Sequence, residues 1–508
     1  MRAEIEKAVN KKINFNVSTN EKFGDYSSNV AILLKKNPKK IAKKIKSPYI
    51  SKIEIAGPGF LNFTLSEKGL IEGIKKISNC PKPGLGQKIQ VEFISANPTG
   101  ELHIGHGRSA FYGDALANVL EKASHKVERE YFINDSKEST QIKELGKTVL
   151  GKGKSYLTDY LKKKIKSRKW KVDDEGEAGY LMAKEIQKDN EKFIKSLGIK
   201  FDRWFSEERE LRQKTEFKKV LELLKKPPKA SLAKGGKKLV YEKDGALWLK
   251  TSQYGDDEDR VILRSDGSAP YFLSDIAYHV DKFGRKYNKV IDIWGADHHG
   301  HVKRMMSAKE MLGWKGKLEI LISQLVTLKE GGEKRKLSKR KGTIILLKDL
   351  IKEVGLDACK WFYLEKSLST HMDFDMALAK ERSQKNPVYY AQYACARMSS
   401  ILSKSKIKSQ KSKLQVKNKK ILKLEPVRNL IKKLIQFPEI VEDTANDYQV
   451  QRLTNYAYKL AGEFSQFYRD VKVIGSKNEK ELIALIALTR KILADTLKLL
   501  GISAPEKM

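Results

Sequence analysis

The chain has 508 residues, with 101 Lys and Arg against 63 Asp and Glu, which gives a formal net charge of +38 at pH 7. This length predicts roughly three or four domains. The charge favours a large polyanionic partner such as a nucleic acid, with a generally lysine-rich composition as the alternative explanation. Three cysteines without a CxxC pair argue against a disulfide framework or a thiolate zinc site, and no apolar run reaches the roughly 20 residues of a membrane span. We therefore expect a cytoplasmic protein with no membrane partner.

The first 84 residues are expected to form a small α+β domain. After a helical start come the segment Gly24–Leu34 and strands around Ile53–Ile55 and Phe60–Leu65. The sequence PKPGLG at Pro81–Gly86 then ends this domain as a linker.

A strand, a loop and a helix follow between Lys88 and Lys122. Apolar and β-branched residues from Ile89 to Ile94 predict a buried strand, Asn97–Gly100 breaks it, and apolar residues from Ala110 to Leu120 recur at helical spacing. A second strand at Glu128–Ile133 makes this the start of a βαβ unit.

The rest of the chain is expected to hold a helical insertion, further strands and a helical C-terminal part. Residues 136 to about 240 are lysine-rich and mostly helical, which indicates an insertion into a nucleotide-binding domain. The later strand-like runs expected to complete a parallel sheet are Leu247–Lys250, Val290–Trp294 and Leu318–Val326. From Thr343 the pattern is helical to the C-terminus, interrupted by a Lys/Ser run at Ser403–Lys420 that is typical of a solvated loop.

The predicted helix that runs to about Leu120 begins near His103, Gly105 and His106. These residues at its N-terminus predict a phosphate site. A helix N-terminus carries unpaired N–H groups and about half a positive charge, so it binds anions. A P-loop is excluded, since Thr148 stands where the first glycine of that motif belongs. The pattern G-x-G-x-x-A at Gly105–Ala110, with acidic residues about 20 positions later, keeps a dinucleotide fingerprint open as a minor alternative.

A basic loop far along the chain completes the phosphate hypothesis. Lys336–Gly342 follows the strand-like Leu318–Val326, so it can lie at the same carboxyl edge of the sheet as His103, where open α/β sheets bind ligands. Transfer at a phosphoryl centre needs in-line positioning and cations where charge builds up on leaving pyrophosphate. Two histidines and a lysine loop can supply both.

The two motifs, His103-Ile104-Gly105-His106 and Lys336-Leu337-Ser338-Lys339-Arg340, resemble the HIGH and KMSKS signatures of the class I aminoacyl-tRNA synthetases. Longer stretches, among them SANPTGELHIGHGR, REYFIND, YFLSDIAYH, GADHHGH and NPVYYAQYACAR, are similar to the arginyl-tRNA synthetase family, and the likeness runs nearly end to end. The chain departs from the family pattern at Leu337, at Arg340 and at Ser136–Ser139.

The resemblance implies an α/β fold of the class I synthetase type, built on a Rossmann-like nucleotide-binding domain. The implied parts are an N-terminal tRNA-elbow-binding α+β domain at 1–84, a Rossmann-like catalytic domain at 85–342 with its helical insertion at about 136–240, a helical stem at 343–385 and an all-helical anticodon-binding domain at 386–508.

The resemblance also implies roles for particular residues. Those expected to be catalytic, by binding the ATP phosphates and the leaving pyrophosphate, are His103, His106, Lys336 and Lys339. Those expected to bind ATP are Gly105, Asp297 and Ser338, with a helix N-cap as the alternative for Asp297. Those expected to bind tRNA are Tyr390, Tyr393 and Arg397, with packing between helices as the alternative for the tyrosines.

Arginine as the amino acid demands carboxylates and a phenol, because a guanidinium presents five donors in a rigid fork. The resemblance places this role on Glu207, Tyr271 and Asp275, and a helix would bring the last two to one face. An acidic helix start is the alternative for Glu207, and core packing is the alternative for Tyr271. The residues expected to bind the α-amino and carboxylate groups, or to orient the pocket, are Glu92, Ser95 and Asn97.

The resemblance implies that the chain ligates L-arginine to tRNA(Arg) through an arginyl-adenylate, with Mg²⁺ accompanying ATP, and that it acts as a monomer. Adenylate formation is expected to need bound tRNA. The alternatives are another HxGH-type class I synthetase and a tRNA-binding paralogue without charging activity. No protein metal site is expected, because His298, His299 and His301 lack Cys or carboxylate partners at ligand spacing.

Overall fold

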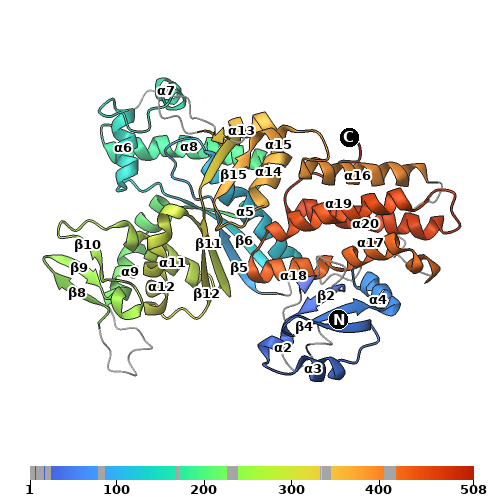
Figure 1. Cartoon of the computed structure of the whole chain (residues 1–508). Helices are drawn as coiled ribbons and strands as arrows, with labels where there is room; N and C mark the ends of the chain where they lie inside the picture. The colour runs from blue at the N-terminus through green and yellow to red at the C-terminus, as the bar shows by residue number, and fades with distance from the viewer. Residues whose placement is uncertain are drawn as a thin grey trace.

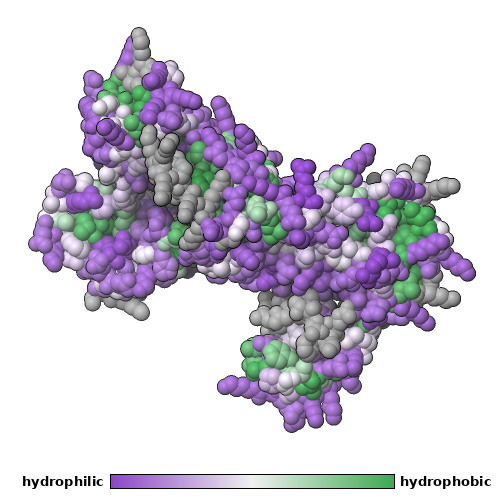
Figure 2. All heavy atoms as spheres, turned by 45° about the horizontal axis from the view of Figure 1, so that its top comes forward, coloured by the Kyte–Doolittle hydropathy of each residue, from purple (hydrophilic) through white to green (hydrophobic). Residues whose placement is uncertain are grey.

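The computed structural model describes residues 6, 16–17, 24–77, 86–167, 171–214, 216–225, 238–331, 333–334, 345–405 and 419–508. A small N-terminal domain, a central α/β domain and a C-terminal group of helices follow one another along this part of the chain (Figure 1). Hydrophilic residues cover most of the face seen in Figure 2. Among the described residues, no helix combines the length and apolar character needed to cross a membrane.

The central domain is built on a five-stranded parallel sheet. Its strands are β5 (Lys88–Glu92), β6 (Lys126–Ile133), β7 (Arg203–Ser206), β11 (Lys289–Gly295) and β12 (Lys317–Ser323). They lie in the order β12-β11-β5-β6-β7, and every neighbouring pair is parallel. The strand order reverses between β5 and β11, so a ligand crevice is expected at the carboxyl ends of these two strands.

Helices cover both faces of this sheet. Tyr131 belongs to the main apolar core and Phe132 to a second cluster, because successive side chains of a strand point to opposite faces. On one side α5 (Ile104–Lys122) packs in the main core, and on the other α11 (Tyr271–Gly284) and α12 (Val302–Met311) pack in the second cluster. The expected strand–loop–helix–strand unit is confirmed.

The first excursion from the sheet differs in part from the expected insertion. It carries α6 (Thr140–Val149), α7 (Asp159–Lys166) and α8 (Glu175–Ser196). The chain then returns as β7, which pairs with β6 although it lies inside the range expected to be insertion. With only 4 residues between charged flanks, β7 is too short to show a periodic signal in the sequence.

The second excursion corrects one expected strand. It holds the π-helix η2 (Glu208–Arg212), α9 (Glu216–Lys225), the 3-10 helix η3 (Thr251–Tyr254) and an antiparallel sheet of β8 (Val240–Lys243), β9 (Ala246–Leu249) and β10 (Arg260–Leu263). The prediction that Leu247–Lys250 joins the parallel sheet is therefore wrong, since β9 pairs with β8 and β10. Asp244 and Gly245, both with positive φ, connect β8 to β9, and so tight a turn permits only antiparallel pairing.

A third sheet joins two strands that precede Thr343 to one strand inside the part expected to be helical. β13 (Val326–Glu330) pairs with β14 (Glu333–Lys334) and with β15 (Met372–Asp375). The helices around β15 are α13 (Leu347–Val354), α14 (Leu356–Leu364) and α15 (Met376–Lys380). The expectation of unbroken helix after Thr343 missed β15, because so short a strand is stabilised by its distant partner β13 rather than by local sequence.

The C-terminal helices are α16 (Pro387–Lys404), the 3-10 helix η5 (Lys419–Lys423), α17 (Glu425–Ile435), α18 (Phe437–Asp447), α19 (Gln451–Asp470) and α20 (Glu479–Leu499). The start of α16 shows why the sequence predicts it. The Asn386 side chain accepts a hydrogen bond from the Val388 N–H, and Pro387 fills the first turn, where an N–H would have no partner.

The N-terminal domain has a four-stranded sheet in the order β1-β2-β4-β3. Its elements are β1 (Asn16–Val17), β2 (Tyr26–Ser28), α2 (Val30–Leu33), α3 (Pro38–Lys44), β3 (Ile50–Ala56), β4 (Phe60–Leu65) and α4 (Glu67–Ile77), which confirms both expected strands. The domain lies against α17 (Figure 1), where Lys432 pairs with Asp25 at 2.8 Å and Arg428 donates to the Leu65 carbonyl at 2.6 Å.

Gly113 in α5 allows this helix to lie close to Phe93, just after β5. A Cβ at position 113 would overlap the Phe93 ring, and both residues are buried. We expect Gly113→Ala to lower the free energy of unfolding by about 1–3 kcal/mol through overpacking, measured by urea denaturation. Gly284→Ala at the end of α11 is the control, because its Cβ meets nothing within 4 Å. Equal losses in both variants would contradict this packing argument.

Candidate active site

Two histidines at the start of α5 cap the backbone of the helix. His103 is the N-cap residue, and its Nδ1 accepts the Gly105 N–H at 3.1 Å. His106 Nδ1 accepts the His103 N–H at 3.1 Å, and the two rings stack with centroids 3.7 Å apart. A Cβ at Gly105 would meet the His103 ring at 2.9 Å, so glycine is needed for this arrangement. The result is a capping box in which both side chains are imidazoles.

The capping bonds determine the chemical form of both rings. Burial lowers the pKa of His103, and burial together with the charge of His103 lowers the pKa of His106 to about 3. Because each Nδ1 accepts a hydrogen bond, each neutral ring carries its proton on Nε2. Within the described part of the chain, neither Nε2 has a hydrogen-bond partner. Two N–H donors at a helix N-terminus are thus available to an anion.

The segment after the basic loop returns to this helix start. The Ile104 N–H donates to the Ile345 carbonyl at 3.0 Å, and the Leu347 N–H donates to the Leu102 carbonyl at 2.9 Å. The chain that follows the second motif is therefore held beside the first motif. The motif residues Lys336, Ser338 and Lys339 lie outside the described residues, and their roles stay predictions.

Arg108 anchors the buried side of α5. Its guanidinium, which is 1% exposed, donates to the carbonyls of Tyr363 at 3.3 Å, Ser367 at 2.5 Å and Thr370 at 3.0 Å. These three carbonyls belong to α14 and to the loop before β15. Arg108 thereby ties the N-terminal part of α5 to α14 and to the loop before β15.

The loop after β5 is strained and firmly held. Ile94 and Ser95 have φ values of 68° and 40°, which are rare for any residue other than glycine and rarest for a β-branched one. Ser95 Oγ bridges the ends of two strands, donating to Glu92 at 2.8 Å and accepting from the Phe132 N–H at 3.1 Å. Asn97 follows as an exposed residue. Of the residues expected near the α-amino group, Glu92 and Ser95 are bonded to each other at the end of β5, and Asn97 is exposed.

Beneath this loop lies a buried ion network centred on Lys282 of α11. Its ammonium donates to Glu92 at the end of β5 and, at 2.7 Å, to Asp292 on β11, and none of the three residues is more than 5% exposed. His279 Nε2 lies 2.9 Å from the second oxygen of Asp292. Burial raises the pKa of Glu92 and would raise that of Asp292, but Lys282 and His279 hold the pKa of Asp292 at about 2.

Glu130 on β6 excludes the dinucleotide alternative. It is fully buried, accepts the Tyr278 hydroxyl at 2.6 Å and pairs with Arg285 at 2.8 Å. Glu128, the other acidic residue at that spacing, also pairs with Arg285, at 3.1 Å. Carboxylates engaged in this way are not available to a ribose.

The three residues expected to bind a guanidinium lie around the start of α11 but in different environments. Tyr271 is 53% exposed at the first position of the helix, and Asp275 follows one turn later, as expected. Asp275 Oδ2 lies 2.7 Å from His301 Nε2. Glu207 is 3% exposed and pairs with Arg212 at 3.3 Å, and burial raises the pKa of Glu207.

Asp297 lies in the 3-10 helix η4 (Ala296–His301), which directly follows β11 at the carboxyl edge of the sheet. Its side chain is 81% exposed. Neither η4 nor α12 receives a side-chain cap, so the alternative that Asp297 is a helix N-cap is wrong. Its carboxylate is exposed at the strand end, where His298 Nε2 lies 3.5 Å from Oδ2.

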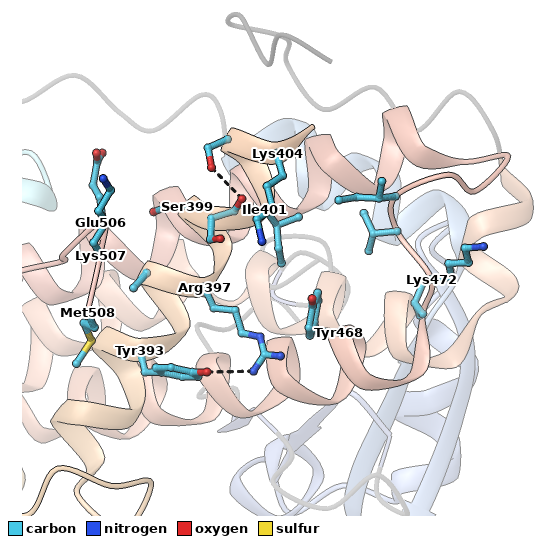
Figure 3. A pocket seen from close by; sticks show the side chains of 16 residues that line it. Tyr393, Arg397, Ser399, Ile401, Lys404, Tyr468, Lys472, Glu506, Lys507 and Met508 are labelled. Carbon is cyan, nitrogen blue, oxygen red and sulfur yellow. Dashed lines mark hydrogen bonds between the residues drawn. The ribbon is translucent and has the colours of Figure 1, made fainter. Parts of the chain in front are cut away.

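A groove of about 1040 Å³ lies in the helical domain, lined by α16, the end of α19 and the C-terminal residues (Figure 3). Arg397 donates to the Tyr393 hydroxyl at 3.3 Å, and its guanidinium carbon lies 4.5 Å from the centre of the Tyr468 ring. Tyr393 and Met508 are 37% and 55% exposed. The groove thus combines a cation with aromatic faces.

Tyr390 lies apart from this groove. Its hydroxyl donates to Ser465 on α19 at 3.1 Å, and its ring packs against Tyr458 with centroids 5.3 Å apart. Of the residues expected to bind tRNA, Tyr393 and Arg397 come together in the groove, while Tyr390 packs between helices.

Sequence reasoning missed three buried charges that support the site, Arg108, Lys282 and Asp292, and the partly buried Arg212. A signal was present, since Asp292 interrupts the apolar strand VIDIW and a lone charge in such a run indicates a buried partner. The neighbouring residues do not show that this partner is Lys282.

Three family models match this chain: an arginyl tRNA synthetase N terminal domain at residues 1–65, a catalytic domain of class I tRNA synthetases (R) at 74–370 and a DALR anticodon binding domain at 391–508. Arginine–tRNA ligases of Bacillus pumilus and Bacillus subtilis are 41% and 40% identical to it over 529 residues, which span 96% of this chain and 92% of theirs.

Solved structures share the fold. An arginyl-tRNA synthetase of Thermus thermophilus superposes with a TM-score of 0.80 at 21% identity, covering 100% of this chain and 99% of its own. One from Plasmodium falciparum gives 0.78 at 19% identity, covering 100% and 98%.

The buried ring of His106 gives the stability of the protein a pH dependence of known sign. Its pKa of about 3 is below the ordinary 6.5, so the unfolded chain binds the proton more readily, and stability falls as the pH drops through 6.5 towards 3. His106→Gln can still accept the His103 N–H. It should therefore weaken the loss of unfolding free energy between about pH 7 and about pH 5, measured by urea denaturation. The same loss in both proteins would contradict the neutral ring.

Proposed function

The chain belongs to the arginyl-tRNA synthetases, class I enzymes that charge tRNA with arginine, and on that premise we propose how its residues share the reaction. The chain itself joins arginine to tRNA with ATP as the second substrate. One observation carries the assignment of roles: the capped histidine pair lies at the switch point of the sheet, with the segment after the basic loop bonded beside it.

Arginine is activated at the start of α5. A carboxylate oxygen of arginine attacks the α-phosphorus of ATP, and the bond to pyrophosphate breaks, which gives arginyl-adenylate. His103 and His106 donate from Nε2 to the phosphates, where neutral donors and the helix N-terminus stabilise the developing charge. Lys336 and Lys339 hold the leaving pyrophosphate. The 2′-hydroxyl of the terminal adenosine of tRNA then attacks the acyl carbon and releases AMP.

The two substrates meet above the Lys282 network. The guanidinium of arginine is bound by carboxylates and a phenol at the start of α11, from Glu207, Tyr271 and Asp275. The other end of the amino acid is oriented by Glu92, Ser95 and Asn97. The adenosine part of ATP is bound by Gly105, Asp297 and Ser338, with the ribose hydroxyls donating to Asp297. The exposure of Asp275 and Asp297 at the carboxyl edge supports these roles.

Mg²⁺ arrives with ATP rather than in a protein site. In the described ranges, no group of three or more His, Cys, Asp or Glu is placed to hold a metal. Magnesium commonly binds through substrate phosphates and one or two protein carboxylates, so the ATP phosphates can supply its main ligands. We also propose that the chain acts as a monomer, and that it works in the cytoplasm, where translation uses charged tRNA.

The tRNA is held along the whole chain. The groove at Tyr393 and Arg397 takes anticodon bases, because aromatic and guanidinium faces stack on splayed bases. The domain at 1–84 binds the elbow, 85–342 holds the acceptor end, 343–385 is the stem and 386–508 binds the anticodon. The net charge of +38 supports a large phosphate contact surface.

The test of the function is pyrophosphate exchange with each amino acid, with and without tRNA(Arg). Exchange should depend on arginine and on tRNA. Exchange with another amino acid would favour a different HxGH-type synthetase, and tRNA binding without any exchange would favour a paralogue that has lost charging.

Asp275→Asn removes the negative charge that faces the substrate guanidinium. We expect the KM for arginine to rise roughly 10- to 100-fold, since bonds to charged groups contribute about 1.5–3 kcal/mol, with the KM for ATP changed far less. Steady-state aminoacylation with each substrate varied in turn measures both. Equal changes in the two constants would argue against guanidinium recognition by Asp275.

Arg397→Met removes the cation from the groove while keeping a long side chain. We expect a higher KM for tRNA(Arg), and binding that loses about one unit of its logarithmic salt dependence, because one cation that neutralises RNA phosphate beside the stacked bases is lost. Arg469→Met is the control, because Arg469 is paired with Asp470 at 2.6 Å and does not line the groove. The same change in both variants would contradict a role for the groove.

A further inference from the structure

We propose that His301 is a positioning residue: it orients the Asp275 carboxylate towards the arginine guanidinium and couples this pocket to the ATP-binding segment η4. The inference rests on the proposed roles of Asp275 and Asp297. It adds a residue to which neither the motifs nor the family resemblance assigned a role in binding.

The hydrogen bond between the two side chains is short and well supported. His301 Nε2 lies 2.7 Å from Asp275 Oδ2, and because a carboxylate only accepts, the imidazole donates. The ring cannot swing freely. It meets Phe272 edge-on with centroids 5.7 Å apart and Trp294 with centroids 5.6 Å apart, so aromatic side chains from α11 and β11 support it on two sides.

The bond leaves the other carboxylate oxygen for a ligand. Oδ1 of Asp275 has no hydrogen-bond partner within the described ranges, and the side chain is 30% exposed. Glu207, the second proposed carboxylate, is buried and paired with Arg212. An incoming guanidinium therefore meets Asp275 as the accessible acceptor, and the direction of Oδ1 depends on the bond that holds Oδ2.

The same bond reaches the ATP side of the crevice. His301 is the last residue of η4, whose Asp297 lies four positions earlier with an 81% exposed side chain. No residue of η4 is fully buried, and the packed ring of His301 with its bond to Asp275 links this segment to α11. Ordering Asp275 by arginine orders His301 and, through it, the segment that carries Asp297. By linkage, ATP must then favour arginine binding by the same factor.

Two substitutions at position 301 separate the hydrogen bond from ring packing. His301→Phe keeps an aromatic ring between Phe272 and Trp294 but removes the donor. His301→Gln restores a donor near the position of Nε2. We expect the KM for arginine to rise roughly 10-fold in His301→Phe and to stay within about 3-fold of the parent in His301→Gln, with thermal stability alike in both. Equal KM values in the two variants would overturn the inference.

The coupling is measured by the dissociation constant of arginine from the enzyme–tRNA complex, with and without a non-hydrolysable ATP analogue. The parent should bind arginine more tightly with the analogue, and His301→Phe should lose most of this enhancement. An enhancement retained in full would overturn the coupling. His125→Phe is the matched control, because His125 also bonds a neighbour, the Gln87 N–H at 3.1 Å, but at the opposite edge of the sheet.

The double variant Asp275→Asn with His301→Phe tests whether His301 acts through Asp275. It should show little further rise in the KM for arginine over Asp275→Asn alone, because the shared interaction is already lost. Additive effects would overturn the inference. If Asp275→Asn itself leaves the KM for arginine unchanged, the proposed guanidinium pocket fails, which is a result distinct from failure at His301.

Discussion

A buried lysine holds together the elements that carry the candidate active site. Lys282 of α11 bonds Glu92 on β5 and Asp292 on β11, the two strands between which the sheet order reverses. Breaking a buried ion pair costs about 3–5 kcal/mol, because the remaining charge stays out of water without a partner. The position of α11 over the strand ends is therefore strongly specified. Tyr271 and Asp275 lie near the start of α11, one to three turns from this network. The network therefore determines where they lie.

The start of α5 is built differently. Instead of placing charges there, the chain caps the helix with two neutral imidazoles, which use Nδ1 for the capping bonds. Strain is concentrated beside it, in the positive φ values of Ile94 and Ser95, which cost of order 1–3 kcal/mol each. The Lys282 network lies directly under that loop, so a rigid base supports the strained segment. Electrostatic stabilisation of a transition state needs donors fixed in this way before the substrate arrives.

Tyr448, which directly follows α18, connects the C-terminal helices to the parallel sheet. This buried residue has a φ of 61°, uncommon for a bulky side chain, and its hydroxyl accepts from Lys289 of β11 at 2.7 Å and bonds Glu319 of β12 at 2.9 Å. Tyr112 of α5 donates to its carbonyl. The C-terminal helices, α5 and the parallel sheet are thus joined by polar contacts inside their interface.

The sequence by itself determined the parallel-sheet core, the helix start at His103 and the family, because apolar runs, capping residues and signature motifs are local patterns. It also placed Tyr271 and Asp275 on one helix. Only the tertiary structure decided that β7 and β15 are strands and that Leu247–Lys250 belongs to a separate hairpin, because short strands depend on partners far away in the chain. The same holds for the ion network and for the bond from His301 to Asp275. A charged residue in an apolar segment indicates that the charge is buried and paired. The sequence does not identify its partner, because the two residues come close only when the chain has folded.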